Sequence, residues 1–229
     1  EPRRLGGHSD LKATAIHGMP AGTHFYSLFD FFANREKPPK LVISGSAIGY
    51  YGPGEQAVDE TGGVVDGFSH QLCRTWENSA RRFESLGCRV CYLRTGIVLG
   101  EDGALARMLP PFKLGLGGPI GSGKQWMSWI HIDDMVAIIL HCISNQQIQG
   151  AVNATAPNPV TNRDFSATLA TVLKRPNYLA MPAVMVKILF GEMGVELLLQ
   201  GQKVVPVKVL GTGFEFKYAN LKAALKNIL

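Results

Sequence analysis

The fold is decided by the stretch Leu41-Val-Ile-Ser-Gly-Ser-Ala-Ile-Gly-Tyr-Tyr-Gly-Pro-Gly54. Its first four residues, Leu41 to Ser44, form a short apolar run with β-branched side chains, and a glycine-rich turn follows from Gly45 to Gly54. A run of this kind is typical of a strand that is covered on both faces, as in a parallel sheet. The stretch therefore predicts a buried parallel strand that ends in a turn.

The residues that follow complete a strand–helix–strand unit. Apolar residues recur at three- and four-residue steps and predict one apolar stripe on a helix, formed by Phe68, Leu72, Trp76, Ala80 and Phe83. Gly87 stands where a helix C-terminal cap is expected. Residues 89–93 predict a second strand, which stops at Arg94-Thr95-Gly96. Such a unit implies an α/β fold with a parallel sheet.

The rest of the chain reads as more helical and indicates a smaller second lobe. Residues 101–128 are rich in glycine and proline. Asp133 or Asp134 is expected to cap an apolar helix over residues 135–143 that is buried on most sides, and residues 151–155 read as a short strand. Three further helices are expected to begin at Thr161, Pro182 and Asn220.

Composition limits the class of protein. Of the 229 residues, 46% are hydrophobic and 18% are charged, which supports a sizeable core and excludes a disordered chain. Four cysteines do not make a disulfide scaffold, and the sequence shows neither an export signal nor a membrane-length apolar run. We therefore expect a cytoplasmic protein. The net charge of +5 is scattered along the chain, so nucleic acid is not an expected partner.

Residues 1–38 are harder to read. They hold an aromatic cluster between Phe25 and Phe32 that could form one turn of a buried helix, although its periodicity is poor.

The turn after the first strand carries hydroxyl groups that could act on a ligand. Open α/β sheets bind ligands at the carboxyl ends of their strands, which is where Ser46 is expected to lie. Its hydroxyl could bind a reacting carbonyl or hydroxyl, while the alternative is a tight turn whose glycines supply positive φ. Gly45 directly precedes Ser46, so the G-x-S-x-G elbow of a serine hydrolase is absent.

Two other motifs are weaker. Residues 118–124 nearly match a phosphate loop, but Gln125 stands where a serine or threonine must hold magnesium, and an ordered surface loop is favoured. His131, Asp133 and Asp134 make a metal site conceivable. The isoleucines that alternate with His131 indicate instead a strand that runs into a capped helix, and we expect no metal.

Five separated motifs resemble the extended short-chain dehydrogenase/reductases and occur in that family's order. The first three span residues 41–52, 93–100 and 129–135. The longer run at residues 108–123 is similar to the atypical, sugar-nucleotide-epimerase-like branch. Residues 201–206 with 213–217 resemble the characteristic C-terminal extension of that branch.

The resemblance implies a Rossmann-type parallel sheet, incomplete at the N-terminus, with a smaller and mostly helical C-terminal substrate lobe. On this basis residues 1–100 are the remainder of the NAD(P)-binding domain and residues 101–229 are the substrate lobe, partly interleaved with it. Residues 150–229 would form the family-specific extension. The resemblance further implies NADP as cofactor, with NAD as the alternative, a small-molecule substrate and no membrane partner; a homodimer is left open.

The resemblance also assigns site residues. Ser46 matches the family's catalytic serine beside the nicotinamide. The segment from Arg94 to Val98 matches the part of the family that lines the nicotinamide side of the cofactor cleft, with Val98 as the backbone contact. The residues expected to contact the cofactor are Ser44, Gly45, Arg94, Thr95 and Val98.

One departure from the family concerns catalysis. Active members carry a Tyr-x-x-x-Lys pair, and alignment on Glu77 puts Ser69 at the tyrosine position and Cys73 at the lysine position. A serine hydroxyl cannot replace a phenolate base at neutral pH. The alternatives for this role are Tyr50, Tyr51 and His70.

The resemblance therefore implies an NAD(P)-dependent oxidoreductase or epimerase-like protein that acts on a small hydroxyl- or carbonyl-bearing substrate. The lost pair supports another class, a non-catalytic NAD(P)-binding sensor or scaffold.

A second departure generates a prediction about cofactor affinity. The family places its pyrophosphate on a G-x-x-G-x-x-G turn at a helix N-terminus, and residues 1–38 contain no such turn. Asp10 also stands where relatives carry an arginine, and an acid there repels a 2′-phosphate. We expect the 229-residue chain by itself to bind a dinucleotide weakly or not at all. Calorimetric titration with NADP⁺ measures this, and tight binding would contradict it.

Overall fold

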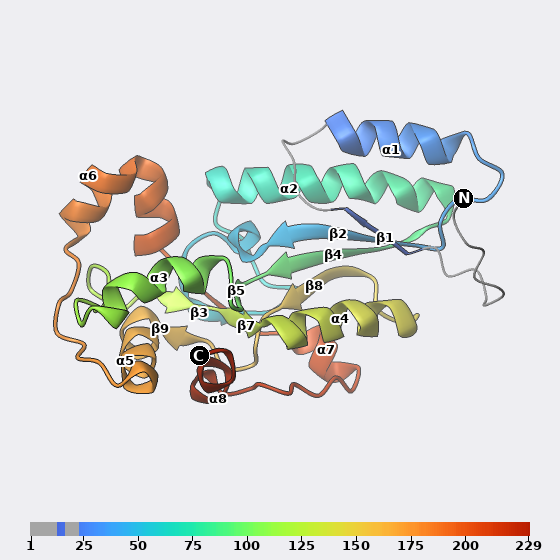
Figure 1. Ribbon diagram of the computed structural model, residues 1–229. Helices are drawn as coiled ribbons and strands as arrows, with labels where there is room; N and C mark the ends of the chain where they lie inside the picture. Colours follow the sequence, from blue (N-terminus) through green and yellow to red (C-terminus); the bar gives the residue numbers. More distant parts are fainter. Residues whose placement is uncertain (1–12, 17–22) are drawn as a thin grey trace, which may run out of the picture.

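The computed structural model describes residues 13–16 and 23–229, and a parallel sheet lies at its centre (Figure 1). The sheet has four strands in the order β1-β2-β4-β8, and every neighbouring pair is parallel. Their bounds are Ala13–Ile16 (β1), Leu41–Ala47 (β2), Arg89–Thr95 (β4) and Gly150–Ala154 (β8). The expected α/β fold with a parallel sheet is confirmed.

The strand β2 is longer than its sequence predicts. The expected turn begins at Gly45, but β2 continues through Ala47, because residues 45–47 pair in register with residues 93–95 of β4. Pairing with a neighbouring strand outweighs the weak strand preference of glycine. The turn itself is a 3-10 helix, η1 (Ile48–Tyr51), which ends at Gly52.

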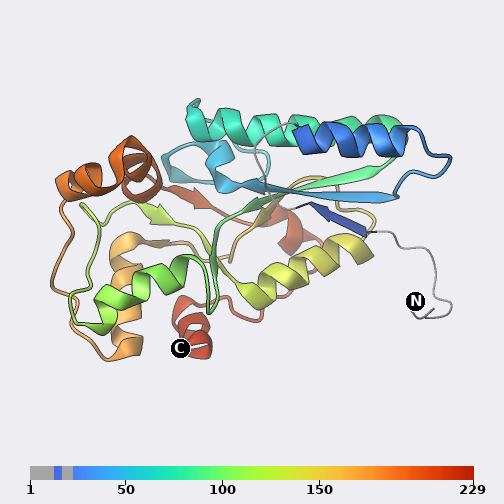
Figure 2. The same ribbon diagram turned by 45° about the horizontal axis from the view of Figure 1, so that its top comes forward.

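Helices cover both faces of the sheet, as Figures 1 and 2 show. One face carries α1 (Thr23–Ala33) and α2 (Phe68–Arg81). The helix α2 continues as the 3-10 helix η2 (Arg82–Leu86). The opposite face carries α4 (Ile132–Ser144) and α7 (Val207–Gly211).

Alternation along the strands assigns each side chain to a face. Val42 of β2 and Tyr92 of β4 pack with Phe83 in the core beneath α1 and α2. Ile43 and Leu93 pack in the core beside α4 instead. Because side chains alternate along a strand, the even-numbered residues at the strand ends point toward α2.

The buried face of α2 is not the predicted apolar stripe. Phe68 is 64% exposed, and Leu72 and Trp76 are only half-buried, although Ala80 and Phe83 are buried as expected. The buried side chains facing the strand ends are His70, Cys73 and Glu77. The prediction was wrong because these polar groups find buried partners at the strand ends. Gly87 ends η2 in the left-handed conformation, as predicted.

The helix α4 also differs from expectation. Its cap is His131, whose Nδ1 accepts a hydrogen bond from the Asp133 amide at 3.0 Å, rather than Asp133 or Asp134. The helix is not buried on most sides, because Val136 and Leu140 lie exposed on its outer side.

The aromatic cluster near the N-terminus belongs to the eleven-residue helix α1 rather than to a single buried turn. Phe29 packs edge-on against Phe83 with ring centroids 5.5 Å apart, whereas Phe31 is exposed. The side chains of Phe25 and Tyr26 lie outside the described residues.

The second lobe is built from helices. Residues 101–128 contain a helix that the glycine and proline content did not predict, α3 (Ala104–Lys113). The three helices expected from their caps are present as α5 (Asn162–Leu173), α6 (Ala183–Gly194) and α8 (Leu221–Ile228). A core of large apolar side chains joins α3, α5 and α8, and it includes Leu105, Phe112, Phe165 and Leu225.

Short strand pairs interleave the two halves of the chain. The segment β3 (Gly54–Val58) pairs with β10 (Gln202–Val204), and β5 (Ile97–Leu99) pairs with β7 (Trp129–His131). The strands β6 (Trp126–Met127) and β9 (Val160–Thr161) form a third pair, and a π-helical turn spans Val195–Leu199. Within the described ranges, no helix has the length and apolar character needed to cross a bilayer.

The turn after η1 leads to a stability prediction. Gly52 has φ +68, and a Cβ there would lie 2.4 Å from the Val65 carbonyl oxygen. We expect Gly52→Ala to lower the free energy of unfolding by more than about 1 kcal/mol, since both the backbone conformation and the available space exclude alanine. Urea denaturation measures this change. Gly54→Ala is the control, because a Cβ at Gly54 meets nothing within 4 Å; equal losses in both variants would contradict the prediction.

Candidate functional site

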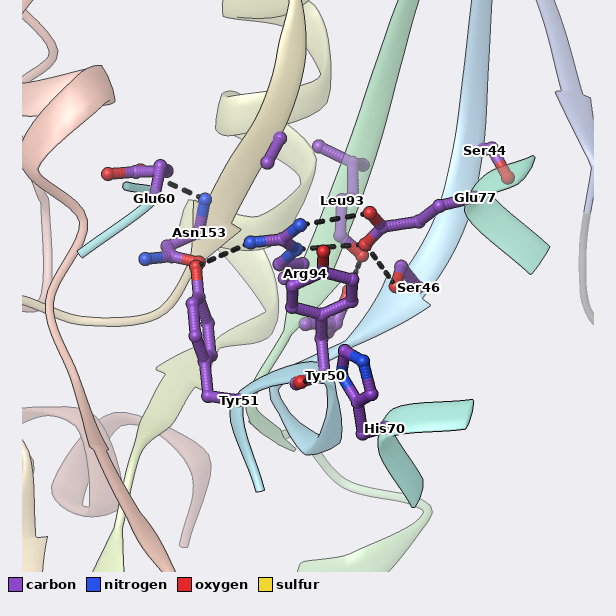
Figure 3. Close-up of polar contacts among 12 residues, drawn as sticks. Ser44, Ser46, Tyr50, Tyr51, Glu60, His70, Glu77, Leu93, Arg94 and Asn153 are labelled. Carbon is purple, nitrogen blue, oxygen red and sulfur yellow. Dashed lines mark hydrogen bonds and ion pairs between the residues drawn. The ribbon is translucent and has the colours of Figure 1, made fainter. Parts of the chain in front are cut away.

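The carboxyl ends of β2 and β4 bring two polar side chains together. Ser46 and Arg94 are register partners, and both point toward α2. Glu77 of α2 reaches both of them, as Figure 3 shows. The three side chains are at most 7% exposed, so this is a buried polar cluster.

A two-pronged ion pair forms the centre of the cluster. Arg94 Nε donates to Glu77 Oε1 at 2.8 Å, and Arg94 Nη2 donates to Glu77 Oε2 at 2.9 Å. Burial alone lowers the pKa of the Arg94 guanidinium, but the hydrogen bonds to Glu77 and Tyr51 raise that pKa above its ordinary value. The guanidinium is therefore a permanent positive charge beside the strand ends.

The Ser46 hydroxyl belongs to the same cluster. Ser46 Oγ donates to Glu77 Oε1 at 2.9 Å. A serine hydroxyl has one proton, so only its lone pairs remain for another partner. The structure thus orients Ser46 through Glu77, and its catalytic role stays a prediction.

Tyr51 connects the cluster to the next strand. Its hydroxyl accepts a hydrogen bond from Arg94 Nη1 at 3.0 Å and donates one to Asn153 Oδ1 of β8 at 2.7 Å. Burial raises the pKa of Tyr51, and the neighbouring Arg94 offsets only part of that rise. The phenol therefore stays protonated at neutral pH.

The network continues from Asn153 into the C-terminal part of the chain. The Asn153 side chain donates through Nδ2 to the Val205 carbonyl at 2.9 Å. The backbone N–H of Asn153 donates to Glu60 Oε1 at 3.0 Å. Glu60 Oε2 accepts from the Lys208 amide at 3.1 Å. The strand ends are thus tied to the segment that leads into α7.

Tyr50 and His70 close one side of the cluster. The Tyr50 ring covers the guanidinium, with Arg94 Cζ 3.4 Å from the ring centroid. The His70 ring packs against the Tyr50 ring with centroids 4.8 Å apart, and His70 Nδ1 bonds the Tyr50 carbonyl oxygen.

The two residues at the positions of the family's Tyr/Lys pair lie beside this cluster. Cys73 contacts the Ser46 side chain and the Ala47 backbone, and burial raises the pKa of its thiol. Ser69 lies against Gly49, where a Cβ would come within 3.0 Å of the Ser69 Cβ. A neutral thiol does not supply the positive charge that a lysine would bring next to Ser46.

Sequence reasoning did not identify Asn153 and Glu60, and it used Glu77 only as an alignment marker. Two signals were available. Asn153 is a polar residue inside the buried strand Ala-Val-Asn-Ala, and Glu77 lies four residues after Cys73 on the same face of α2. Glu60 lies in a loop and gave no comparable signal.

A hollow of about 580 Å³ opens at the same edge of the sheet. Gly96, which is two residues beyond Arg94, begins its lining. Val98, the expected backbone contact of the cofactor, also lines it, together with Ile97, Gly100, Glu101, Asp102, Gly103, Ala104 and Ile132.

The other expected cofactor contacts do not line this hollow. Ser44 is fully buried, and its hydroxyl donates to the Gly45 carbonyl at 3.3 Å. The Thr95 hydroxyl donates to the Leu93 carbonyl at 3.2 Å. These hydroxyls satisfy the backbone of their own strands, and Arg94 is held by Glu77. Their contact with a cofactor stays a prediction.

The hollow fits an uncharged ring better than a phosphate. Glycine backbone leaves part of its wall open, while Glu101 and Asp102 on its lining repel a phosphate. None of the strands in the described sheet leads through a G-x-x-G-x-x-G turn into a helix, as a pyrophosphate site requires. Asp10, expected near the cofactor phosphate, lies outside the described residues. The lining residues therefore fit the nicotinamide end of a dinucleotide and not its pyrophosphate.

The histidine and two aspartates that made a metal conceivable have other partners. His131 caps α4, and Asp133 pairs with Lys217 Nζ at 2.9 Å. Asp134 accepts from the amides of Lys217 and Tyr218, both at 2.9 Å. The two aspartates anchor residues 217 and 218 to the start of α4.

Two family models match the chain. One is described as the NAD dependent epimerase/dehydratase family and matches residues 28–154. The other is described as a domain of unknown function (DUF1731) and matches residues 181–228.

Curated relatives are similar over most of the chain. A protein of Arabidopsis thaliana named epimerase family protein SDR39U1 homolog, chloroplastic, is 44% identical over 196 residues. The epimerase family protein YfhF of Bacillus subtilis is 38% identical over 197 residues. Each alignment covers 85% of this chain, but only 56% and 65% of the respective relative. The chain thus spans less than two thirds of the length of these relatives.

Solved structures agree with the fold. The crystal structure of human epimerase family protein SDR39U1 with NADPH has a TM-score of 0.83 and 35% identity, covering 90% of this chain and 70% of that one. UDP-glucose 4-epimerase from Thermotoga maritima, solved with UDP-glucose, has a TM-score of 0.69 over 89% of this chain and 65% of that one. Its identity is 16%, so this likeness shows the Rossmann-type fold alone.

The buried ion pair leads to a second stability prediction. We expect Glu77→Ala to lower the free energy of unfolding by about 3–5 kcal/mol, because it leaves Arg94 buried without a counter-charge. Urea denaturation followed by circular dichroism measures the loss. The control is Lys217→Ala, which removes an exposed ion pair with Asp133 and should change stability far less. Similar losses in the two variants would contradict the prediction.

Proposed function

The chain belongs to the NAD dependent epimerase/dehydratase family, and we propose that it is an NADP(H)-linked oxidoreductase acting on a small hydroxyl- or carbonyl-bearing substrate. A sugar nucleotide is one substrate of this kind. The observation that carries the proposal is the place of Ser46, at the carboxyl end of a parallel strand whose neighbour β4 leads directly into a glycine-lined hollow. This edge is where open α/β sheets bind their ligands.

Membership of the family agrees with the resemblance inferred from the motifs. The first model spans the strands and helices that build the sheet from α1 to β8, and the second, over residues 181–228, lies within the segment expected to be the C-terminal extension. The branch and the extension named from the sequence are thus confirmed.

The choice of NADP(H) rests on a relative. Human SDR39U1, at 35% identity, was solved with NADPH. When bound, a nicotinamide dinucleotide supplies or accepts a hydride. In this chain the Val98 backbone and the open glycine backbone of the hollow would hold the nicotinamide end.

The buried cluster would orient the substrate rather than react with it. Glu77 accepts the hydrogen bond of the Ser46 hydroxyl, so Ser46 Oγ would accept a hydrogen bond from a donor group of the substrate beside the reacting oxygen. Arg94 is covered by the Tyr50 ring and fixed by Glu77, so its charge acts on the site as a rigid background field.

A second candidate function has its own supporting observation. Ser69 and Cys73 replace the Tyr/Lys pair, and the Cys73 thiol is neutral and buried. A non-catalytic sensor or scaffold that binds NADP(H) without hydride exchange would have this site. Cofactor binding without turnover would favour it.

We also place the protein in a reducing compartment such as the cytoplasm. The cysteines of the described chain are free thiols, and all four are buried. Proteins of oxidising compartments more often pair their cysteines.

The enzymatic proposal predicts the effect of one substitution. We expect Ser46→Ala to slow hydride transfer at least about a hundredfold, because the substrate loses a group that positions it beside the reacting carbon, while NADPH affinity stays unchanged. The assay follows NADPH absorbance with a panel of ketones, and NADP⁺ reduction with UDP-sugars, each at excess cofactor. Ser79→Ala is the control, since the Ser79 hydroxyl bonds the Thr75 carbonyl of its own helix. Absence of turnover with every substrate, at an NADPH concentration at which calorimetry shows the unmodified protein to be saturated, would overturn the enzymatic proposal.

A further inference from the structure

The imidazole of His70 has a defined tautomer. His70 lies in the first turn of α2, and its Nδ1 bonds the backbone carbonyl oxygen of Tyr50. A carbonyl oxygen only accepts hydrogen bonds, so Nδ1 carries the proton. In the neutral ring, Nε2 is then the basic nitrogen.

That basic nitrogen is available. Among the described residues, the buried side-chain atoms that lack a partner are His131 Nε2 and Asn177 Oδ1. His70 Nε2 is not one of them, and it forms no hydrogen bond to a described residue, so this atom keeps some solvent-accessible surface. The His70 residue as a whole is only 6% exposed. The ring is thus held rigidly, with one basic nitrogen free.

His70 lies on the face of α2 that serves the site. Positions 70, 73 and 77 follow the helical spacing of three and four residues and form one row. Cys73 contacts Ser46, and Glu77 Oε1 accepts a hydrogen bond from the Ser46 hydroxyl. His70 precedes Cys73 by one turn of the helix. Its ring packs on the Tyr50 ring, and Figure 3 shows the two side by side.

The neighbouring titratable groups are either hydrogen-bonded to other residues of the cluster or held neutral by burial. Both Glu77 oxygens bond Arg94, and one of them also accepts from Ser46. The Tyr51 hydroxyl bonds both Arg94 and Asn153. The Cys73 thiol is buried and neutral. Within the described part of the cluster, His70 is the group that combines an orienting partner with a free lone pair, the arrangement expected of a general base.

We propose that His70 is the acid–base residue of this site, in place of the Tyr/Lys pair, and that its substrates are secondary alcohols and the matching ketones. In alcohol oxidation, Nε2 takes the hydroxyl proton while the hydride on the same carbon passes to the oxidised nicotinamide. The O–H and C–H bonds break, and the C=O bond forms. In reduction, the imidazolium returns the proton to the oxygen. This inference rests on the proposed NADP(H)-linked function.

The first test needs no turnover. Diethyl pyrocarbonate acylates accessible, unprotonated imidazole nitrogens, and mass spectrometry locates the product. We expect His70 to react in the free protein, to react more slowly when NADPH is added, and to react much faster than the buried His131. Equal inertness of His70 and His131 would overturn the proposal.

The second test separates proton transfer from a structural role. The substitution His70→Asn keeps an N–H that can donate to the Tyr50 carbonyl, but it removes the basic nitrogen. We expect His70→Asn and His70→Ala to lose about a hundredfold or more in hydride transfer, with NADPH affinity unchanged. Added imidazole should restore part of the activity of His70→Ala. Activity of His70→Asn within about threefold of the unmodified protein would show a structural role and overturn the proposal.

His141 supplies the control variant. His141→Asn removes another part-buried histidine, which bonds Thr212 on the opposite face of the sheet, and it should leave the rate unchanged. Turnover in the unmodified protein with normal rates in both His70 variants would refute only the role of His70. No turnover in the unmodified protein when it is saturated with cofactor would refute the proposed function, and the role of His70 with it.

Discussion

The ion pair between Arg94 and Glu77 is the interaction on which the rest of the site depends. It joins β4 to α2 across the carboxyl edge of the sheet, and both oxygens of Glu77 take part in it. A charge buried at this depth is tolerated only with a partner, since removing one member leaves the other desolvated. Ser46, Tyr51 and the Tyr50 ring are arranged around the pair, so their positions follow from it.

This arrangement also explains which groups remain free to react. Ser46 and Tyr51 carry hydroxyl groups that look reactive in the sequence, but each hydroxyl donates its hydrogen bond to a buried acceptor. Burial keeps Cys73 neutral, and it raises the pKa of Tyr51. His70 differs because its partner is a backbone carbonyl, which fixes the ring and leaves the second nitrogen unused. The polar cluster and the glycine-lined hollow both lie at the carboxyl edge of the sheet.

Three mistakes in reading the sequence have a common cause. The β2 boundary was wrong because residues 45–47 are held in the sheet by β4 rather than by their own preference. The apolar stripe on α2 was wrong because His70, Cys73 and Glu77 are buried against strand ends that lie far away in the sequence. At the start of α4, His131 caps the helix instead of a neighbouring aspartate, because Asp134 is bound to the backbone at residues 217 and 218. Each error reflects a partner that local spacing cannot reveal.

The sequence by itself determined the α/β class, the parallel strands, the caps at Thr161 and Asn220, and the family, because these depend on local periodicity, turn chemistry and contiguous motifs. Tertiary structure alone decided which polar side chains meet. Ser46, Glu77, Arg94 and Asn153 come from β2, α2, β4 and β8, and Glu60 joins them from a loop. A hydrogen bond between such residues depends on strand order and helix packing, which bring distant segments within a few ångströms. Tertiary structure also decides that His70 Nε2 is free, because packing α2 against η1 brings Nδ1 to the Tyr50 carbonyl and leaves Nε2 without a partner among the described residues.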